Sequence, residues 1–511
     1  MNGLNNSQEK VQKEIVDYVC QKNGLINNNA IELLKVKTNF KEIIDELLED
    51  NVFMIDEKNV INKLLKQELK TVSVEDSKIV EVFKTNFKPL AKEFDFKPEI
   101  ISSLDVTGKS LCEGTVEDFH NFFLDKYYSL EKILKRRIDF SPQALISLER
   151  MQKNKEFCFV GMVNKKWVSK KGHFILQLED PEKKVIGVVM KDKQKLFEEA
   201  NKLLLDNVAG FKASKASNDM VIINEFIWPD VPVREPKTIE EDLMLAVTSD
   251  LHVGSNHFLE QSFKKFLAWL NGRVGGEKEK EKAGKIKVLL LVGDNVDGLG
   301  IYPNQLPDLN IRGIREQYKA LSDLLLEVPE HVHVVMCPGQ HDAVRRADPQ
   351  PAISKRFLPE LYEQENFHFT GSPGWIDFQG IKILLYHGAS FHDLYSSVNY
   401  LKHTEPQGAM QDILRRRDLM PCFGLRQPYV PEKKNYLVIK EEPNIFCTGD
   451  MHHNGYAYYK GTLLVNGGTW QSVTSFQEEL GHKPTPGILP LISLKNYTIN
   501  ENHFIRSEKS E

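Results

Sequence analysis

Cysteines, long apolar runs and a signal-like leader are scarce or missing in this sequence. The six cysteines are scattered over the chain without a C-x-x-C pair, which excludes a zinc ribbon and a disulfide framework and favours a reducing, intracellular setting. No apolar stretch approaches the roughly 20 residues that span a bilayer. The opening MNGLNNSQEK also lacks the basic-then-apolar pattern of a secretory signal. We therefore expect a cytoplasmic protein that does not contact membranes.

Neither sign of charge dominates the sequence. The 67 Lys and Arg residues nearly balance the 72 Asp and Glu residues, for a net charge of −5. This balance neither supports nor excludes a nucleic-acid partner, because a local basic patch or bridging metal ions can bind phosphates on an acidic chain. At 511 residues the chain is too long for one hydrophobic core, and a prior of roughly 150 residues per domain predicts about three domains.

The spacing of apolar residues divides the first half of the chain. Residues 1–65 carry apolar side chains at helical spacing and predict a small helical N-terminal domain. Residues 66–112 are rich in Lys and Glu with weak periodicity, which favours a linker. The third part, residues 113–235, begins with one long helix predicted over 115–134, where the apolar residues return to helical spacing.

After this helix the apolar period switches from 3.6 to 2. Strands are predicted at 157–163, 173–180, 185–190 and 220–224, with one helix at 194–204. Short strands, a helix and a final strand are typical of a small Greek-key barrel such as an OB-fold.

Trp167 and the neighbouring lysines at 165, 166, 170 and 171 have two interpretations. Such a cluster can bind a single nucleic-acid strand through stacking and charge. It can equally form a solvated hairpin or a protein interface, because a fold does not determine its function.

From about residue 240 to 495, buried-looking strands alternate with helices, which is typical of an α/β domain. Five of these strands end in side chains that can bind metal ions. The five ends are Asp250-Leu-His252, Gly293-Asp294-Asn-Val-Asp297, Gln340-His341-Asp342, His387-Gly388 and Gly449-Asp450-Met-His452-His453. Each motif alone is more often a turn with a structural histidine, but five in one domain argue against chance. Ligands bind beyond the C-terminal ends of strands in open α/β sheets, so these ends can converge on one site.

Carboxylates and imidazoles in this arrangement suit hydrolysis of a phosphodiester. The substrate is anionic, so its hydrolysis requires charge neutralisation and a nucleophile at neutral pH, and two divalent ions supply both. Mn²⁺ is the ion we expect, with Mg²⁺, Fe²⁺ or Zn²⁺ as alternatives, because the donors are oxygen and imidazole. The absence of thiolate ligands argues against a structural zinc centre.

The motif order D-x-H, GD, G-x-H-D, H and G-x-x-H resembles the calcineurin-like metallophosphoesterase superfamily. Further segments make the chain look like the small-subunit family of the archaeal family-D replicative DNA polymerases. They are Leu178-Glu-Asp-Pro, Trp228-Pro-Asp-Val-Pro, Ser249-Asp-Leu-His-Val-Gly-Ser and Arg415-Arg-Arg-Asp-Leu-Met-Pro-Cys-Phe-Gly. The resemblance runs from about residue 100 to the end. It implies an α+β multidomain protein: a helical N-terminal domain, an OB-fold barrel, and a metallophosphoesterase β-sandwich flanked by helices over 240–495.

The resemblance also assigns roles to individual residues. It gives Asp250, His252 and His452 to a first metal ion. Asp294 would bridge the two ions, and the second would be held by His387, Gln340 and Asp450. His341 would face the scissile phosphate, stabilising charge or protonating the leaving oxygen. Asp342 would orient His341 through a hydrogen bond.

The sequence departs from the superfamily pattern at the second ion, where Gln340 replaces the usual Asn and Asp450 replaces the usual His. A longer amide and a shorter carboxylate can together preserve coordination, and a second anionic donor favours harder ions such as Mn²⁺ or Mg²⁺. Alternatively, His453 is the ligand, or the second site is weak.

Several other polar residues have alternative interpretations from sequence. Arg345 and Arg346 are candidates to bind DNA phosphate, with ordinary surface arginines as the alternative. The run Arg415-Arg-Arg417 would face DNA, a protein partner or solvent. His392 and His403 are interpreted as structural.

The function implied is that of the small subunit of a two-subunit replicative DNA polymerase with metal-dependent 3′→5′ exonuclease (proofreading) activity. The expected partners are a large catalytic polymerase subunit in a heterodimer, DNA as a single strand or primer 3′ end, and a sliding clamp as a further candidate. Such a protein would be associated with the nucleoid. Two alternatives stay open: a catalytically inactive scaffold subunit and a free-standing phosphodiesterase.

Overall fold

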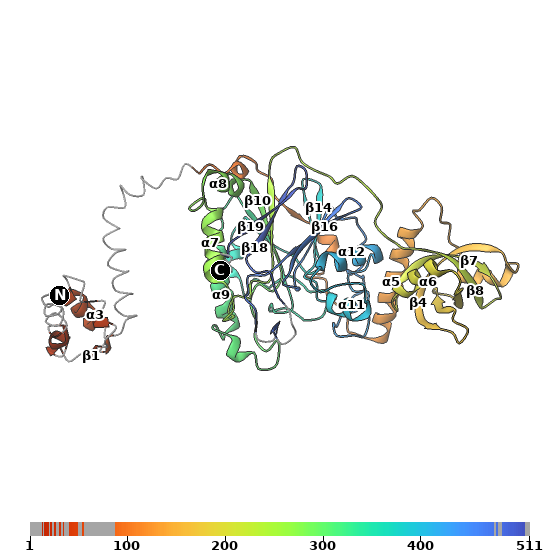
Figure 1. The fold of residues 1–511 in the computed structure, drawn as a ribbon, viewed down its shortest axis with the longest axis horizontal. Coiled ribbons are helices and arrows are strands. Elements are labelled where there is room, and N and C mark those ends of the chain that lie inside the picture. The colour runs from red at the N-terminus through yellow and green to blue at the C-terminus, as the bar shows by residue number, and fades with distance from the viewer. Residues whose placement is uncertain are drawn as a thin grey trace. The chain divides into compact units, whose positions relative to one another are not determined.

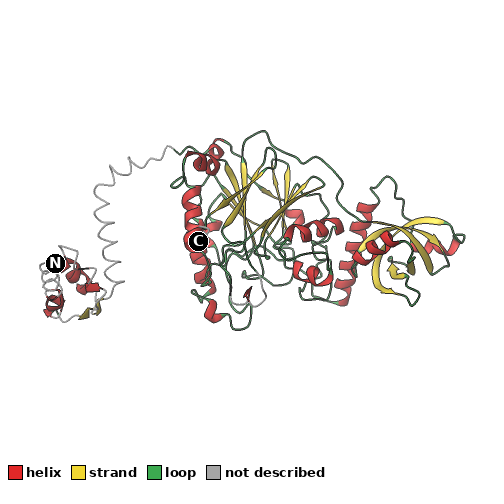
Figure 2. Cartoon of the chain, in the orientation of Figure 1, coloured by secondary structure: helices red, strands yellow, loops and turns green. Residues whose placement is uncertain are grey.

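The computed structural model describes residues 87–474, 477–478 and 483–505. Within the first 55 residues it describes 13, 15–19, 21–22, 25–26, 30–31, 34, 40–49 and 54–55. The chain divides into two compact units, Met1–Phe87 and Lys88–Glu511 (Figures 1 and 2). Among the helices described in either unit, none has the length and apolar content needed to cross a bilayer.

The N-terminal unit contains helix α3 (Phe40–Glu49) and a pair of short parallel strands, β1 (Leu25–Ile26) and β2 (Met54–Ile55). Its buried apolar cluster draws Ile15 from a helical stretch and Ile43 from α3. The helical spacing of these apolar residues therefore corresponds to a buried helix face in the described part of this unit.

The larger unit is built around two six-stranded sheets. The first sheet has the order β12 (Phe367–Phe369), β11 (His333–Cys337), β10 (Ile286–Val292), β9 (Met244–Thr248), β18 (Ile488–Ser493), β19 (Ile499–His503). The second sheet has the order β16 (Asn454–Tyr459), β17 (Thr462–Gly467), β15 (Ile445–Thr448), β14 (Ile381–Leu385), β13 (Gly374–Phe378), β3 (Glu99–Ile100).

The two sheets pack face to face over one apolar core. Leu245 and Val335 of the first sheet share this core with Ile383 and Val465 of the second. Strands β9, β10 and β11 are buried along their whole length, because parallel strands of a layered domain are covered on both faces. This explains why the sequence shows them as continuous apolar runs.

Helices flank the two sheets (Figure 1). On the side of the first sheet lie α7 (Glu260–Leu270), α8 (Glu277–Gly284) and α9 (Ile314–Leu325), and on the side of the second lie α11 (Phe391–Ser397) and α12 (Pro406–Arg416). The short α10 (Pro359–Tyr362) lies against α9 and β12. Apolar residues of α11 and α12 share a buried cluster with outward-facing residues of the second sheet.

A closed five-stranded barrel forms the other part of this unit. Its order is β4 (Glu156–Val168), β5 (Phe174–Glu179), β6 (Lys184–Val189), β8 (Met220–Ile227), β7 (Val208–Lys215), with α6 (Gln194–Lys202) between β6 and β7 in sequence. The unit is therefore a mixed α+β protein with sheets and a barrel. Strand β7 is an addition to the four strands predicted from sequence.

Helix α5 (Val116–Leu134) joins the barrel to the sandwich (Figure 1). Thr115 caps it by accepting from the N–H of Asp118, whose carboxylate accepts from the N–H of Thr115 in return. Tyr127 packs on the barrel, whereas Phe122 belongs to the cluster beneath α11 and α12. The helix predicted at this place is confirmed.

Two arginines of the run at 415–417 also hold the two parts together, rather than facing solvent. Arg415 pairs with Glu199 of the barrel helix and lies over the ring of Trp228, 4.3 Å from its centroid. Arg416 is buried and donates to Asn207 at the foot of the barrel. Arg415 and Arg416 are therefore a structural connection in this chain, whereas Arg417 donates to the carbonyls of Ile439 and Glu441 within the sandwich.

The structure differs from the linker expected over 66–112. Residues 66–86 of that range lie outside the described residues. Over the described residues 87–112 of that range, Leu90–Glu93 forms a short 3-10 helix, and β3 adds an antiparallel edge strand beside β13. Two-residue pairing of this kind has no periodicity in sequence, so pattern alone does not reveal it.

Candidate metal centre

The five polar strand ends meet at one pocket. β9, β10 and β11 are parallel neighbours in the first sheet, and β14 and β15 are parallel neighbours in the second. Their C-terminal loops are bonded to one another: the N–H of Asp250 donates to the carbonyl of Gly293, and that of His252 donates to the carbonyl of Asp294, both at 3.0 Å. The pocket above them has a volume of about 800 Å³.

The backbone at these loops takes an unusual conformation. Asp250, His252, Asp294, Asp450 and His452 all have φ between +49° and +64°, the left-handed region that costs a non-glycine residue roughly 1–3 kcal/mol. Such strain persists only where the surrounding structure enforces it, and it gathers at functional sites. Here it turns successive side chains toward one point.

Asp250 lies between the histidines of the first and second sheets. Its Oδ1 is 3.3 Å from Nε2 of His452, 3.8 Å from Nε2 of His252 and 4.0 Å from Nε2 of His387. The two imidazole nitrogens of His252 and His452 are only 3.1 Å apart. Three donor atoms thus converge from β9 and β15 on the position expected for the first ion.

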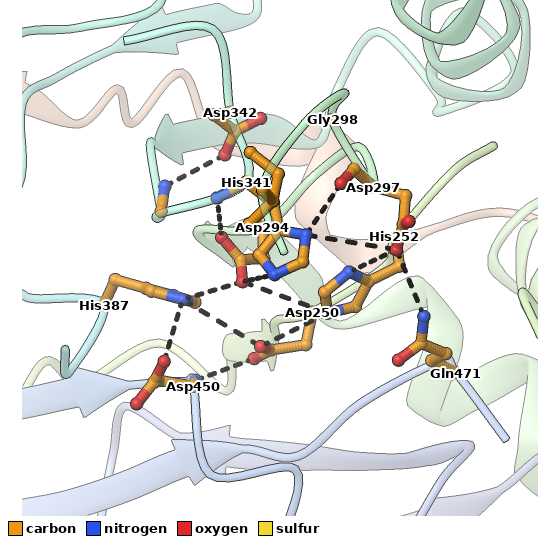
Figure 3. Close-up of polar contacts among 12 residues, drawn as sticks. Asp250, His252, Asp294, Asp297, Gly298, His341, Asp342, His387, Asp450 and Gln471 are labelled. Carbon is orange, nitrogen blue, oxygen red and sulfur yellow. Dashed lines mark hydrogen bonds and ion pairs between the residues drawn. The ribbon is translucent and has the colours of Figure 1, made fainter. Parts of the chain in front are cut away.

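Asp294 occupies the middle of the cluster, as Figure 3 shows. Its Oδ2 is 3.2 Å from Nε2 of His387 and 3.9 Å from Nε2 of both His252 and His341. Its Oδ1 accepts the N–H of His341 at 2.8 Å. This side chain therefore touches both expected ion positions, which is the place required of a bridging carboxylate.

The outer nitrogen of each central histidine is held by a hydrogen bond. Nδ1–H of His252 donates to Asp297 Oδ1 at 3.0 Å, that of His387 to the carbonyl of Val292 at 2.7 Å, and that of His341 to the carbonyl of Asp297 at 2.7 Å. These bonds leave each Nε2 directed at the cluster, where it can bind a metal ion in place of a proton, the arrangement typical of metal-ligating histidines.

Electrostatics at the centre favour positive charge. Burial acts to lower the pKa of His252, but the carboxylates of Asp250 and Asp297 raise it to about 10. Burial likewise opposes ionisation of Asp294, yet His387 and His341 hold the pKa of Asp294 below its usual value. Buried carboxylates that draw protons onto neighbouring imidazoles would bind divalent cations in the same way.

The donor set fits two divalent ions. Three groups of donors have all their ligand atoms within 4.8 Å of one another: Asp250–His252–His452, His252–Asp294–His341 and Asp250–Asp294–His387. Asp250 and Asp294 each belong to two groups, so neighbouring ions would share ligands. Carboxylate and imidazole donors without thiolate suit Mn²⁺, Mg²⁺, Fe²⁺ or Zn²⁺.

The two residues that depart from the superfamily pattern also lie at the pocket. The side chain of Gln340 lines it, and neither Nε2 nor Oε1 has a hydrogen-bond partner among the described residues. A polar group left unpaired inside a protein is costly unless a ligand engages it. Asp450 Oδ1 lies 3.8 Å from Nε2 of His387. Both positions are thus compatible with ligands of the second ion, and His453 lines the same pocket.

Gly339 allows the loop after β11 to lie directly against Asp294 and His387. A Cβ at this residue would lie 2.2 Å from Oδ1 of Asp294 and 2.8 Å from the ring of His387. Any larger side chain would push the loop, and with it Gln340 and His341, away from the cluster.

The structure gives Asp342 a different task from the one expected. Its carboxylate accepts from Nδ2 of Asn295 at 3.0 Å, from the N–H of Gly339 at 2.9 Å and from the hydroxyl of Tyr318 at 3.0 Å. Burial and the charge of Asp294 raise the pKa of Asp342 to about 6. It braces the β10 and β11 loops, whereas His341 is oriented by the carbonyl of Asp297.

The two candidate DNA-binding arginines, Arg345 and Arg346, lie in different surroundings. The guanidinium of Arg345 donates to the carbonyl of Pro349 and to Ser110, and it pairs with the buried Glu432 at 2.9 Å. Arg346, in contrast, lines the pocket. The structure does not bring Arg345 to the pocket, because its side chain is engaged elsewhere.

Sequence reasoning named Asp297 and His392 but did not predict the roles that the structure gives them at the site. Asp297, three residues after Asp294, orients His252, and the GD-x-x-D spacing was a signal that could have suggested it. His392, interpreted as structural, places Nε2 3.1 Å from Oδ2 of Asp450. His392 lies on α11, outside the strand-end motifs, so no sequence pattern indicated that it contacts Asp450.

Comparisons with known proteins identify the family of this chain. The family of the B subunits of DNA polymerases alpha and epsilon matches residues 245–457, a span that contains every candidate metal ligand named above. The DNA polymerase II small subunit of Methanocaldococcus jannaschii is 37% identical over 419 residues, covering 82% of this chain and 70% of that protein. Its namesake from Methanothermobacter thermautotrophicus is 38% identical over 405 residues, covering 79% and 82%. The chain therefore belongs to the family of archaeal DNA polymerase II (family-D) small subunits.

Proposed function

We propose that this chain is the small subunit of a two-subunit replicative DNA polymerase and that it removes nucleotides from a DNA 3′ end. The relatives are named as small subunits of DNA polymerase II, which supports assembly with a large catalytic subunit. The observation that carries the hydrolytic activity is the placement of Asp250 and Asp294, each within reach of histidines from both sheets.

The proposed centre holds two divalent ions. Asp250, His252 and His452 would bind the first, Asp294 would bridge, and His387 with Gln340 and Asp450 would bind the second. When bound, such ions neutralise the charge of the phosphate and make a nucleophile available at neutral pH.

The protein's own contribution is orientation and proton transfer. His341 stands beside the cluster with Nδ1–H bonded to a carbonyl, so Nε2 is the atom that would contact the phosphate or exchange a proton with the leaving 3′ oxygen. Burial lowers the pKa of His341 despite the carboxylate of Asp294. The pocket of about 800 Å³ suits a nucleotide-sized ligand, which favours a frayed strand end over an intact duplex.

The finer fold assignments belong to the same proposal. The barrel order is β4-β5-β6-β8-β7, and helix α6 lies between β6 and β7 along the chain. This arrangement supports an OB-fold. The two facing sheets with metal-competent strand ends support a metallophosphoesterase domain. A barrel beside the sandwich also favours a polymerase subunit over a free-standing phosphodiesterase, which needs no such domain.

The test is Mn²⁺-dependent digestion of 5′-labelled single-stranded DNA by the purified chain, with metal content measured in parallel. A ladder of progressively shortened labelled products would demonstrate 3′→5′ removal. Asp294→Asn should abolish the ladder with little change in thermal stability, because a neutral amide cannot hold two cations together. Asp323→Asn, an exposed carboxylate on α9, is the matched control and should leave the ladder intact.

Two results would overturn the proposal. Full activity of Asp294→Asn with unchanged metal content would remove the two-ion model. A wild-type chain that binds two ions yet cleaves no DNA, alone or with the large subunit, would identify an inactive scaffold subunit.

A further inference from the structure

Two loops form one wall of the pocket and run side by side. The N–H of Asp348 donates to the carbonyl of Pro428 at 3.1 Å, and the N–H of Val430 donates back to the carbonyl of Asp348 at 2.8 Å. This short parallel bridge brings together Arg346 from one loop and Arg426 from the other, and both line the pocket.

The half-buried Gln427 and the buried Asp393 hold both loops in place. Nε2 of Gln427 donates to the carbonyl of Arg346 at 2.9 Å and to Oδ2 of Asp348 at 3.1 Å. The carboxylate of Asp393, which is 4% exposed, accepts the N–H groups of Arg426 and Gln427 at 3.1 and 2.8 Å. The backbone at both arginines is therefore fixed before any ligand arrives.

The two guanidinium groups have few partners of their own. Arg346 makes one hydrogen bond of 3.3 Å, to the carbonyl of Ile301, and Arg426 makes no side-chain hydrogen bond or ion pair among the described residues. Arg273 is an example of an engaged arginine in the same unit, because it pairs with Glu327 at 3.3 Å. The nearby pocket carboxylates are occupied, because Asp450 bonds to His392 and Asp393 to backbone amides.

We propose that Arg346 and Arg426 form an anion subsite for the phosphates that flank the scissile one, so that the ligand is a nucleic-acid strand and not an isolated phosphodiester. This inference rests on the proposed function of the same pocket. A guanidinium binds phosphate through two parallel hydrogen bonds, and two of them on a fixed wall match the repeating charge of a strand. The metal centre then acts on one phosphate while the arginines hold its neighbours.

The experiment compares two substrates on the full-length chain. One is a 5′-labelled single-stranded oligonucleotide, and the other is bis(p-nitrophenyl) phosphate, which has a single phosphodiester and no flanking phosphate. Arg426→Ala and Arg346→Ala should each raise KM for the oligonucleotide by about tenfold or more, the loss expected for a charge-assisted hydrogen bond, with a much smaller change in kcat. The rise in KM for the small diester should be several-fold less. Arg426→Lys should fall between wild type and Arg426→Ala.

Salt dependence supplies a readout that a structural defect would not produce. Each lost phosphate contact should reduce the slope of log affinity against log salt by about 0.7 for a single strand. Arg273→Ala, which removes a paired surface arginine in the loop after α7, is the matched control and should change neither KM nor slope.

The outcomes separate the subsite from the proposed hydrolytic function. Equal losses on both substrates, or no loss on either, would overturn the flanking subsite. If the wild type cleaves neither substrate, hydrolysis fails, and binding of a fluorescent single strand in metal-free buffer decides the subsite by itself. Unchanged binding by the arginine variants would then overturn it.

Discussion

Asp450 and His392 form an ion pair beside the place proposed for the second ion. His392 reaches Oδ2 of Asp450 at 3.1 Å, and the other carboxylate oxygen faces His387 at 3.8 Å. Asp450 raises the pKa of His392 against burial and the charge of Arg426, which favours a protonated donor. The superfamily pattern has histidine where this chain has Asp450, so we infer that His392 orients the shorter carboxylate as a ligand.

Metal binding tests this pairing at the residue scale. Asp450→Ala should weaken the second ion while sparing the first, which depends on Asp250, His252 and His452. His392→Ala should weaken it by roughly 10–100-fold, the usual cost of losing an outer partner. Titration calorimetry with Mn²⁺ resolves both effects.

The same titration tests whether Gln340 and Asp450, the two residues that depart from the superfamily pattern, bind the second ion together. Gln340→Asn alone should impair the second ion, and adding Asp450→His should restore it, because groups that share an ion are non-additive. His120→Ala, exposed on α5, is the control. Metal content unaffected by Asp450→Ala would show that position 450 is not a ligand and would make His453 the next candidate.

Strand β7 fits beneath an aromatic ring because it carries glycine at 210. Phe140, which is 3% exposed, packs with Tyr127 and Leu130 of α5 against the barrel. A Cβ on Gly210 would lie 2.7 Å from Cζ of this ring, closer than real contacts allow. The absence of a side chain at Gly210 therefore allows Phe140 and α5 to pack closely on the barrel.

Gly210→Ala should destabilise the chain by roughly 1–3 kcal/mol, because Phe140 must leave its position in a packed core. Thermal melting followed by circular dichroism measures the effect. Adding Phe140→Leu should recover part of the loss, since the smaller side chain yields space. Gly408→Ala is a control of opposite sign: it lies in α12 with only Leu401 nearby, at 3.6 Å, and should gain roughly 0.5–1 kcal/mol. Equal losses at both glycines would contradict the packing argument.

At the scale of the whole molecule, a buried arginine couples the barrel to the sandwich. Arg416 pairs with Asp412 at 2.7 Å and donates to the carbonyl of Lys202 at 2.8 Å and to the side chain of Asn207. It is 2% exposed and lies over the ring of Trp228. Asp412 belongs to α12 of the sandwich, whereas the other partners belong to the barrel, so one guanidinium spans the junction.

Removing this arginine should loosen the junction. Arg416→Ala leaves Asp412 buried without its partner and should cost roughly 3–5 kcal/mol. Hydrogen exchange should show faster opening where the barrel meets α12 and less change in the core between the two sheets. Arg416→Met with Asp412→Leu should restore most of the stability, because a buried ion pair is replaceable by apolar side chains. Uniform destabilisation of both parts would show that the arginine supports the fold generally and not the junction.

The sequence by itself determined the family, the buried strands and the five polar strand ends. Continuous apolar runs such as Val288–Val292 are local signals of strands covered on both faces. Because parallel strands present their C-terminal ends at one edge, motifs after Thr248, Val292 and Cys337 had to meet. This rule accounts for the three strand ends of the first sheet, whereas their meeting with the ends of β14 and β15 depends on how the second sheet packs on the first.

Only the tertiary structure decided which long or polar side chains reach one another across the chain. Arg345 finds Glu432, and β3 joins β13 through two residues. These partners lie far apart in sequence. Burial and geometry determine which of them a flexible side chain contacts, and neither produces a periodic pattern in the sequence. That is why Asp342 became a brace between loops instead of a partner of His341, and why the metal centre's ligand set could be expected while its supports could not.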